Sequence, residues 1–449
     1  MKPGNRPSLA PILVAISLCL ALAQPLAGLA ADKPYDGVEL NFLMISNHKV
    51  GLESRLDEFE ARTGIKVNLL PVSMPDLYSK LGVEFAAGGS AYDVVELMWA
   101  AAQGYARGGN LLPLDEMINA QGLDLDQYAG VYVDRHMIRY PQNPQGQVIC
   151  LPHQADIQLL AYRKDLFGDP AEKAAFQGQY GYPLAPPETF DQFLEIARFF
   201  TRDTDGDGKN DLFGTTVMGK NFPSLVGDIT PYIRGFGGDW IDAGFHPAVA
   251  SKDTVKGIQF YVDLFARYKV TPPGAATYSW EDEIADFQHN KLAMMIIWPG
   301  QVVALENAEA SQAAGKIGYA VVPGRAATVG GWAVALPKAG KHPQAAFAFI
   351  KWLTSTETAL ARARETGFST AAQAVYEDPQ MRSKYAYLDA FKTSLPYGRG
   401  WPQIGEFTSI WQIGAQELSR VFAGEIDIPK ASQLMNQRLD QLMKDGGYY

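Results

Sequence analysis

The stretch from residue 38 to residue 69 changes its hydrophobic period twice, which limits the fold more than any other feature. Residues 38–45 alternate between apolar and polar side chains, as a half-buried strand does. Apolar residues between positions 52 and 59 then recur at helical spacing, and Gly64 is placed to end that helix. Alternation returns at residues 65–69. A strand–helix–strand unit of this kind predicts parallel pairing with a right-handed crossover.

Further strands and helices alternate along the chain and predict the α/β class with doubly wound sheets. Residues 92–99 form the next predicted strand, and residues 158–162 another. The segment 287–300, FQHNKLAMMIIWPG, runs from a polar start into a continuous apolar run that suits a strand covered on both faces. Trp99 and Trp298 stand at strand ends. Ligands of open α/β sheets lie outside the carboxyl ends of the strands, so both indoles are candidate ligand contacts.

The first thirty residues have the pattern of a secretory signal peptide. Lys2 and Arg6 precede an apolar run at residues 12–23, and small residues at 28–30 suit cleavage after Ala30. We therefore predict residues 1–30 as a signal peptide, and an exported, periplasmic protein that is not membrane-embedded. After cleavage Cys150 is the remaining cysteine, so no intrachain disulfide is expected.

Charge and motif content exclude several function classes. The chain is acidic, with a formal net charge of −10 and no Lys/Arg run, so a nucleic-acid partner is not expected. The HExxH, GxSxG and P-loop patterns are absent from the sequence. Cys150 and His153 lie three positions apart, but no third group is placed to orient the His. We expect no catalytic residue and no cofactor.

An acidic loop at residues 201–213, TRDTDGDGKNDLF, resembles the start of an EF-hand calcium loop. Its carboxylates occupy the first, third, fifth and ninth positions of the pattern: Asp203, Asp205, Asp207 and Asp211. The twelfth position needs a bidentate Glu and holds Gly214 instead. An acidic loop closed by Asx-turns is the alternative interpretation, and we expect no metal site.

Several sequence pieces follow one another in a characteristic order: FEARTGIKVNLL (59–70), YDVVELMW (92–99), YARGGNLLPLDEM (105–117), LPHQADIQLLAYRKDLF (151–167), FQHNKLAMMIIWPG (287–300), GGWAVALPK (330–338) and AAFAFIKWLTSTET (345–358). In the order and spacing of these pieces over the whole mature chain, the sequence resembles the extracellular solute-binding proteins of bacterial ABC importers, in the carbohydrate-binding branch that includes maltodextrin-binding proteins.

This resemblance implies a two-lobed periplasmic-binding-protein fold, with discontinuous doubly wound lobes joined by about three crossovers. The crossovers would fall near Cys150, within residues 323–330 and near residues 367–368. The N-lobe would comprise residues 31–150 plus 328–367, and the C-lobe residues 151–327 plus 368–449. The implied partners of a monomer are a small carbohydrate or polyol, held between the lobes, and the permease subunits of the transporter.

A sugar site needs aromatic faces for the ring and planar polar groups for the hydroxyls. Several Trp residues at strand ends or in loops are candidate platforms, and family position adds polar residues near the expected cleft. The candidate ligand contacts are Asn47, His48, Trp99, Gln154, Asp156, Trp240, Trp298, Gly331, Trp332, Arg399 and Trp401.

Each candidate has a structural alternative. Any of the Trp residues could pack within a lobe, Asp156 could form an inter-lobe salt bridge, and His48 could be a solvated turn residue. Trp352 is interpreted as structural because it lies on a surface helix, and Trp411 because it lies in an apolar helix, whereas Trp280 is left open.

Two rival functions remain. An exported glycoside hydrolase would need paired carboxylates, for which Asp156 and Asp239 are the candidates. The same fold could instead bind a polyamine, iron or a phosphodiester. A polyamine would need several carboxylates in the cleft, and iron a cluster of Tyr and His. Many aromatic residues and few charges near the expected cleft favour a sugar or polyol.

Overall fold

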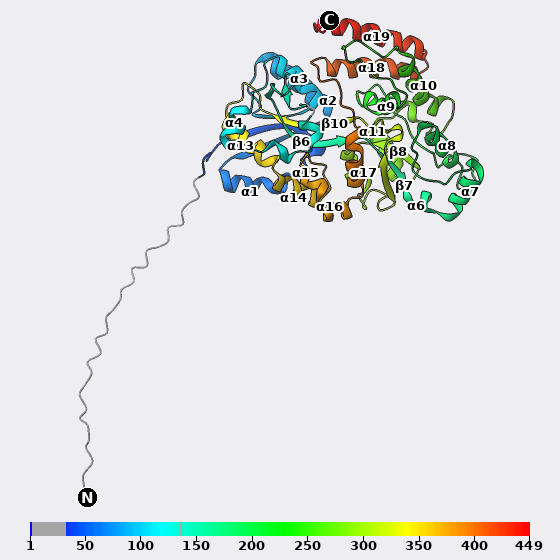
Figure 1. Cartoon of the computed structure of the whole chain (residues 1–449), viewed down its shortest axis with the longest axis horizontal. Coiled ribbons are helices and arrows are strands. Elements are labelled where there is room, and N and C mark those ends of the chain that lie inside the picture. The colour runs from blue at the N-terminus through cyan, green and yellow to red at the C-terminus, as the bar shows by residue number, and fades with distance from the viewer. Residues whose placement is uncertain (2–32, 135) are drawn as a thin grey trace.

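The computed structural model describes residues 1, 33–134 and 136–449, which form two α/β lobes side by side (Figure 1). The predicted α/β, two-lobed fold class is confirmed. Residues 2–30 of the predicted signal peptide lie outside the described residues. Within the described residues, no helix has both the length and the apolar character needed to cross a membrane.

The first lobe is built on a five-stranded sheet in the order β2-β1-β3-β10-β6. Strands β1 and β2 pair in parallel across helix α1, as the change of hydrophobic period predicts, and β1 also pairs in parallel with β3. β10 runs antiparallel to both β3 and β6. The strands are β1 (Glu39–Ile45), β2 (Lys66–Val72), β3 (Val94–Met98), β6 (Leu151–Ile157) and β10 (Val329–Ala335).

The second lobe is built on a three-stranded sheet in the order β8-β7-β9, in which both outer strands run antiparallel to β7. These strands are β7 (Leu159–Arg163), β8 (Met294–Ile297) and β9 (Ile317–Val321). A short hairpin of β4 (Arg139–Tyr140) and β5 (Gln147–Val148) lies apart from both sheets.

Helices cover the faces of the two sheets (Figure 1). Those of the first lobe are α1 (Glu53–Thr63), α2 (Met74–Ala87), α3 (Trp99–Arg107), α4 (Asp115–Gln121), α5 (Gly130–Val133), α13 (Pro343–Leu353) and α14 (Thr356–Thr366). Those of the second lobe are α6 (Lys164–Gly168), α7 (Pro170–Tyr180), α8 (Phe190–Phe200), α9 (Ser224–Gly235), α10 (Lys252–Ala266), α11 (Trp280–Gln288), α12 (Val302–Leu305), α17 (Tyr387–Ser394), α18 (Phe407–Phe422) and α19 (Ile428–Asp445). Helices α15 (Gln373–Glu377) and α16 (Pro379–Lys384) lie on the passage from α14 to α17.

Three segments connect the two sheets. Gln158 alone separates β6 from β7, residues 322–328 separate β9 from β10, and the third segment follows α14. Residues 369–372 still bond to the first lobe, since the Ala155 N–H donates to the Ser369 carbonyl at 3.0 Å. We therefore propose lobe boundaries at Gln158 and after Ala372 in place of residues 150 and 367, while the predicted boundary at residues 327–328 falls within the connecting segment 322–328.

Strands β10 and β6, the last two in the sheet order of the first lobe, carry several residues of the candidate site. All seven residues of β6 and all seven of β10 are buried. β6 nevertheless contains His153, Gln154 and Asp156, which must find partners because a buried polar group without a hydrogen bond is costly. Asp156, two residues before the crossing at Gln158, is the one of the three that lines the space between the lobes.

Candidate ligand-binding site

A cavity of about 490 Å³ lies between the two lobes, where the carboxyl ends of three strands converge. Asn47 and His48 follow β1, Met98 ends β3, and Trp298 follows β8. The first lobe contributes Ile45, Ser46, Asn47, His48, Val72, Ser73, Met74, Pro75, Met98, Asp156, Gly330, Gly331 and Trp332. The second lobe contributes Met218, Phe222, Ser224, Gly227, Asp228, Trp280, Glu281, Glu283, Ile296, Trp298, Gly300, Gln301 and Trp411.

The structure brings six of the predicted contacts together on the walls of this cavity: Asn47, His48, Asp156, Trp298, Gly331 and Trp332. They come from four separate stretches of sequence and from both lobes. The rule that ligands lie at the carboxyl ends of strands selected Trp298, and the family resemblance selected the other five. We propose these six as ligand contacts.

Gly331 shows how closely the cavity wall is built. Its φ is +123°, and a Cβ there would lie 2.4 Å from Trp99 Nε1 and 2.5 Å from the Gln154 carbonyl oxygen. The backbone of β10 passes so close to both neighbours that no side chain fits at this position. Only glycine allows this approach.

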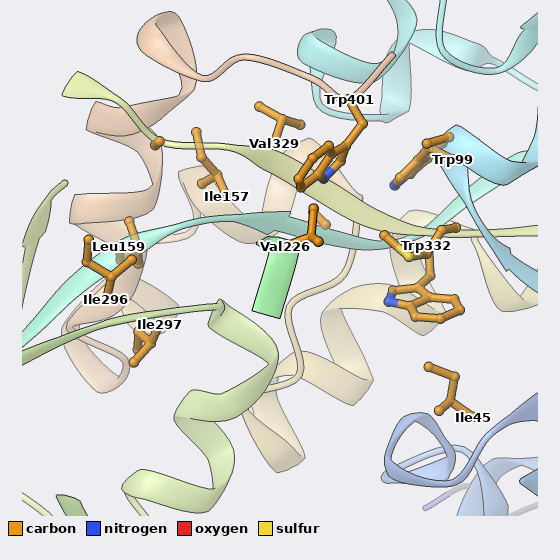
Figure 2. Packing of buried hydrophobic residues seen from close by; sticks show 14 of the residues in the cluster. Ile45, Trp99, Ile157, Leu159, Val226, Ile296, Ile297, Val329, Trp332 and Trp401 are labelled. Carbon is orange, nitrogen blue, oxygen red and sulfur yellow. The ribbon is translucent and has the colours of Figure 1, made fainter. Parts of the chain in front are cut away.

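Trp99 and Trp401 lie behind the wall, outside the set of lining residues. The Trp99 ring stacks on Tyr132 with centroids 4.5 Å apart, and the Trp401 ring packs edge-on against Trp411 at 5.1 Å. In Figure 2 the Trp332 indole and the pair Trp99 and Trp401 appear on opposite sides of the ribbon of β10. The two buried indoles support the wall that lining residues present to the cavity.

Three other predicted contacts also lie away from the cavity. Trp240 is fully buried in the second lobe, where its Nε1 donates to Thr230 Oγ1 at 2.8 Å. Arg399 binds Asp239 at 2.7 Å beside the second crossing. Gln154 donates from Nε2 to Ser369 Oγ at 2.9 Å. These contacts hold the lobe core and the crossing segments, so we leave the three residues out of the proposed site.

Sequence reasoning missed two indoles that line the cavity. Trp411 was interpreted as structural because its helix α18 is apolar, and Trp280 was left open. The Trp411 ring faces the cavity although it is only 6% exposed. A signal for Trp280 existed, since it begins α11 and three acidic residues follow it directly.

The cavity is acidic. Asp156, Asp228, Glu281 and Glu283 line it, and its lining residues include neither Lys nor Arg. The expectation of few charges in the cleft is therefore wrong. It failed because Asp228 and Glu283 come from helices α9 and α11, which sequence position did not connect with the strand ends.

Burial raises the pKa of three of these carboxyl groups. The pKa of Asp156 rises to about 6, although the Gly300 N–H, which donates at 3.2 Å, the Gln154 amide and His48 oppose the shift. The pKa of Asp228 also rises to about 6, opposed by the Tyr261 hydroxyl. Burial and the nearby Asp228 hold the pKa of Glu283 well above its ordinary value.

A buried network positions His48 on the cavity wall. His48 Nδ1 lies 2.7 Å from Glu96 Oε1, and the other Glu96 oxygen accepts from the Ile45 N–H at 2.9 Å. The Arg362 guanidinium donates to the His48 carbonyl at 2.7 Å. His153 Nε2 lies 3.4 Å from Glu96, and burial together with Arg362 lowers the pKa of His153 well below its ordinary value. The two imidazoles and the carboxylate resemble a metal-ligand set, but the positive charge of Arg362 already balances Glu96.

The remaining sequence candidates lie outside the cavity. The Asp203 carboxylate accepts the N–H groups of Gly206 and Gly208 at 2.7 and 2.8 Å, which are the contacts of an Asx-turn loop. Cys150 is buried in an apolar setting that raises the pKa of its thiol. Asp239, the proposed partner of Asp156 in a hydrolase, is instead paired with Arg399 and does not line the cavity.

Two α/β lobes that are joined by three segments and enclose a cavity between them define a solute-binding protein of the two-lobed class. The model of one family, described as bacterial extracellular solute-binding protein, matches residues 46–360. The chain belongs to this family.

Two relatives and one solved structure that resemble this chain are also solute-binding proteins. A probable amino-acid ABC transporter periplasmic-binding protein of Sinorhizobium fredii is 26% identical over 96% of this chain and 95% of its own length. A mannitol-binding protein of Pseudomonas aeruginosa is 26% identical over 86% of this chain and 82% of its own. The structure of a solute-binding protein from Agrobacterium radiobacter in complex with ribitol matches with a TM-score of 0.79 and 26% identity, over 91% of this chain and all of that chain.

Proposed function

We propose that this protein is the substrate-binding receptor of a bacterial ABC importer and that it captures a sugar or polyol in the inter-lobe cavity. The observation that carries the proposal is the distribution of indoles around the cavity. Trp332 lies on the first lobe, whereas Trp280, Trp298 and Trp411 lie on the second. Aromatic faces suit the apolar C–H surface of a sugar or polyol, and a ligand held between them contacts both lobes. The mannitol- and ribitol-binding relatives support this choice of ligand.

Contact with both lobes gives the receptor its mechanism. A ligand that binds only the closed arrangement shifts the equilibrium between open and closed lobes toward the closed one. The three crossing segments allow the lobes to turn as rigid bodies. The closed protein would then present a surface from each lobe to the permease. Export through a cleaved signal peptide, a periplasmic location and a single-chain receptor without enzymatic activity complete the proposal.

Titration of intrinsic tryptophan fluorescence with D-mannitol, ribitol, erythritol, maltose and maltotriose tests the proposal. Four of the eight Trp residues line the cavity, so an occupied site should change the emission. We expect one saturable 1:1 response, with the ligand recovered unchanged. At a ligand concentration about one hundred times Kd, the free energy of unfolding should rise by about 2.7 kcal/mol. Silence with every compound would contradict the sugar or polyol assignment, and conversion of the ligand would favour a hydrolase.

A further inference from the structure

The charged residues of the cavity walls indicate the charge of the ligand, which the aromatic residues of the walls do not. Four carboxyl groups line the cavity, and its described lining residues include no Lys or Arg. They come from both lobes, since Asp156 lies on β6 while Asp228, Glu281 and Glu283 lie on α9 and α11. A ligand that fills the cavity therefore meets carboxylates on two sides.

Glu283 is the most deeply buried of these four carboxyl residues. Its residue is only 3% exposed, and it lines the cavity. Asp156 accepts from the Gly300 N–H, and Asp228 accepts from the Tyr261 hydroxyl. The buried Thr216 hydroxyl stabilises the Glu283 carboxylate by a hydrogen bond, but within the described residues no Lys, Arg or His forms an ion pair with it. A buried carboxylate that lines a cavity without a counter-charge is placed to receive a cationic ligand.

An unpartnered hydrogen-bond donor lies on a different element. Trp411 on α18 lines the cavity, and its Nε1 is buried without a hydrogen-bond partner. An indole N–H is a donor only, so its partner on a ligand must be an acceptor such as a hydroxyl oxygen. The site thus offers carboxylates that suit a cation and one donor that suits a hydroxyl group.

We propose that the ligand carries a positively charged amino group, and that it is an amino sugar or an amino polyol. This inference rests on the proposed sugar or polyol function and adds a charge to the ligand. An ammonium group compensates carboxylates that otherwise repel one another in a buried cavity. The same cation gains from the faces of the indoles that line the walls. A neutral polyol offers neither contribution.

The proposal predicts how binding depends on pH. Glu283 is faced by Asp228 from α9 and by Asp282 and Asp286 from its own helix, and Tyr261 of α10 contacts Asp228. His48 is the group that opposes the pKa shift of Asp156 by its charge. Burial raises the pKa of these carboxyl groups, so an arriving cation must displace protons from them. Affinity for an amino ligand should therefore rise between about pH 5 and about pH 8, with proton release on binding.

A matched pair of ligands gives the test: D-glucamine and D-sorbitol differ only by an ammonium group in place of one hydroxyl. D-glucosamine and D-glucose form the corresponding pair of sugars, and spermidine is a cation without a sugar or polyol part. We expect one amino compound to bind at least about tenfold tighter than its neutral partner near pH 7.5. The preference should fall severalfold in Glu283→Gln and persist in Asp286→Asn, because Asp286 lies on the same helix but pairs with Lys291 outside the cavity.

The outcomes separate this inference from the proposed function. Equal or tighter binding of the neutral partner would overturn the inference and leave the sugar or polyol receptor standing. Spermidine binding tighter than every sugar and polyol would overturn the proposed function and leave the cationic site standing. An unchanged preference in both Glu283→Gln and Glu281→Gln, each shown to be folded by its melting curve, would overturn the assigned contacts. Failure of all five compounds would overturn the amino sugar or amino polyol ligand.

Discussion

Replacement of Asp156 by Asn should stabilise the unliganded protein at neutral pH while it weakens binding. Asp156 is 8% exposed, and burial raises the pKa of its carboxyl from 3.8 to about 6. Between these two values the folded state binds more protons than the unfolded state, so stability falls as the pH rises through this window. Above about pH 6 the penalty has its full value, and below about pH 4 both states are protonated and it vanishes.

The size of the effect follows from the pKa difference. About two pKa units correspond to an upper limit of about 3 kcal/mol, because each unit is worth about 1.4 kcal/mol. The net shift already includes the stabilising bond from the Gly300 N–H to the carboxylate, and Asn keeps an oxygen that can accept the same bond. We therefore expect Asp156→Asn to raise the free energy of unfolding by about 2 kcal/mol near pH 7.5 and by nothing near pH 4.

Urea unfolding of the ligand-free protein at both pH values measures the difference. The matched control is Asp239→Asn, because the Asp239 carboxylate pairs with Arg399 at 2.7 Å and with the buried Arg234 at 3.4 Å. That variant should lose about 1–3 kcal/mol near pH 7.5, since it leaves a buried guanidinium without its counter-charge. A less stable Asp156→Asn at neutral pH, or a difference that does not change with pH, would refute the reasoning.

Three further outcomes follow from the geometry. Trp298→Ala should weaken binding of the tightest ligand in the fluorescence panel by about 2 kcal/mol, roughly 30-fold in Kd, because it removes about 100 Å² of indole face from the cavity wall. Trp352→Phe, outside the cavity, should leave Kd unchanged in the same titration. Gly331→Ala should lower the free energy of unfolding in urea by about 2–4 kcal/mol, because its φ is +123° and a Cβ would overlap two neighbours. Gly82→Ala, in open space on α2, should raise the same free energy by up to about 1 kcal/mol. Calcium in excess should shift Tm by less than about 1 °C, because the loop at residues 201–213 already uses its carboxylates in turns and lacks the bidentate Glu. A saturable rise in Tm with calcium would contradict this expectation.

The fold could be predicted from the sequence where local periodicity decides it. The change of period before and after α1 predicted the parallel pair of β1 and β2, and the strand-end rule led to Trp298 on the cavity wall. The continuous apolar run before Trp298 became β8, which is buried at all four residues. These features depend on neighbours within a few residues.

The rest of the site depends on contacts between distant segments. Trp240 stands in a glycine-rich stretch that suggests an exposed loop, but α18 passes so close that a Cβ on Gly414 would lie 2.9 Å from its ring. Trp411 lies on the same helix, and an apolar helix gives no sign of which face borders a cavity. Asp228 and Glu283 reach the cavity through helix packing that no spacing in the sequence records.

We propose that Gln158, the single residue between β6 and β7, acts as a pivot when the lobes turn. Gln158 is fixed there from three directions, since its Nε2 donates to the Gly227 carbonyl, its Oε1 accepts from the Thr328 N–H, and its own N–H donates to the Thr328 carbonyl. Asp156 lies two residues from this pivot, and Trp298 follows Ile297, which pairs with Leu159 on the other side of it. A point near an axis of rotation travels a short arc. The distance between Asp156 and Trp298 should therefore change little as the lobes turn. This pair would limit the width of the ligand that fits, whereas the more distant walls would close on the ligand.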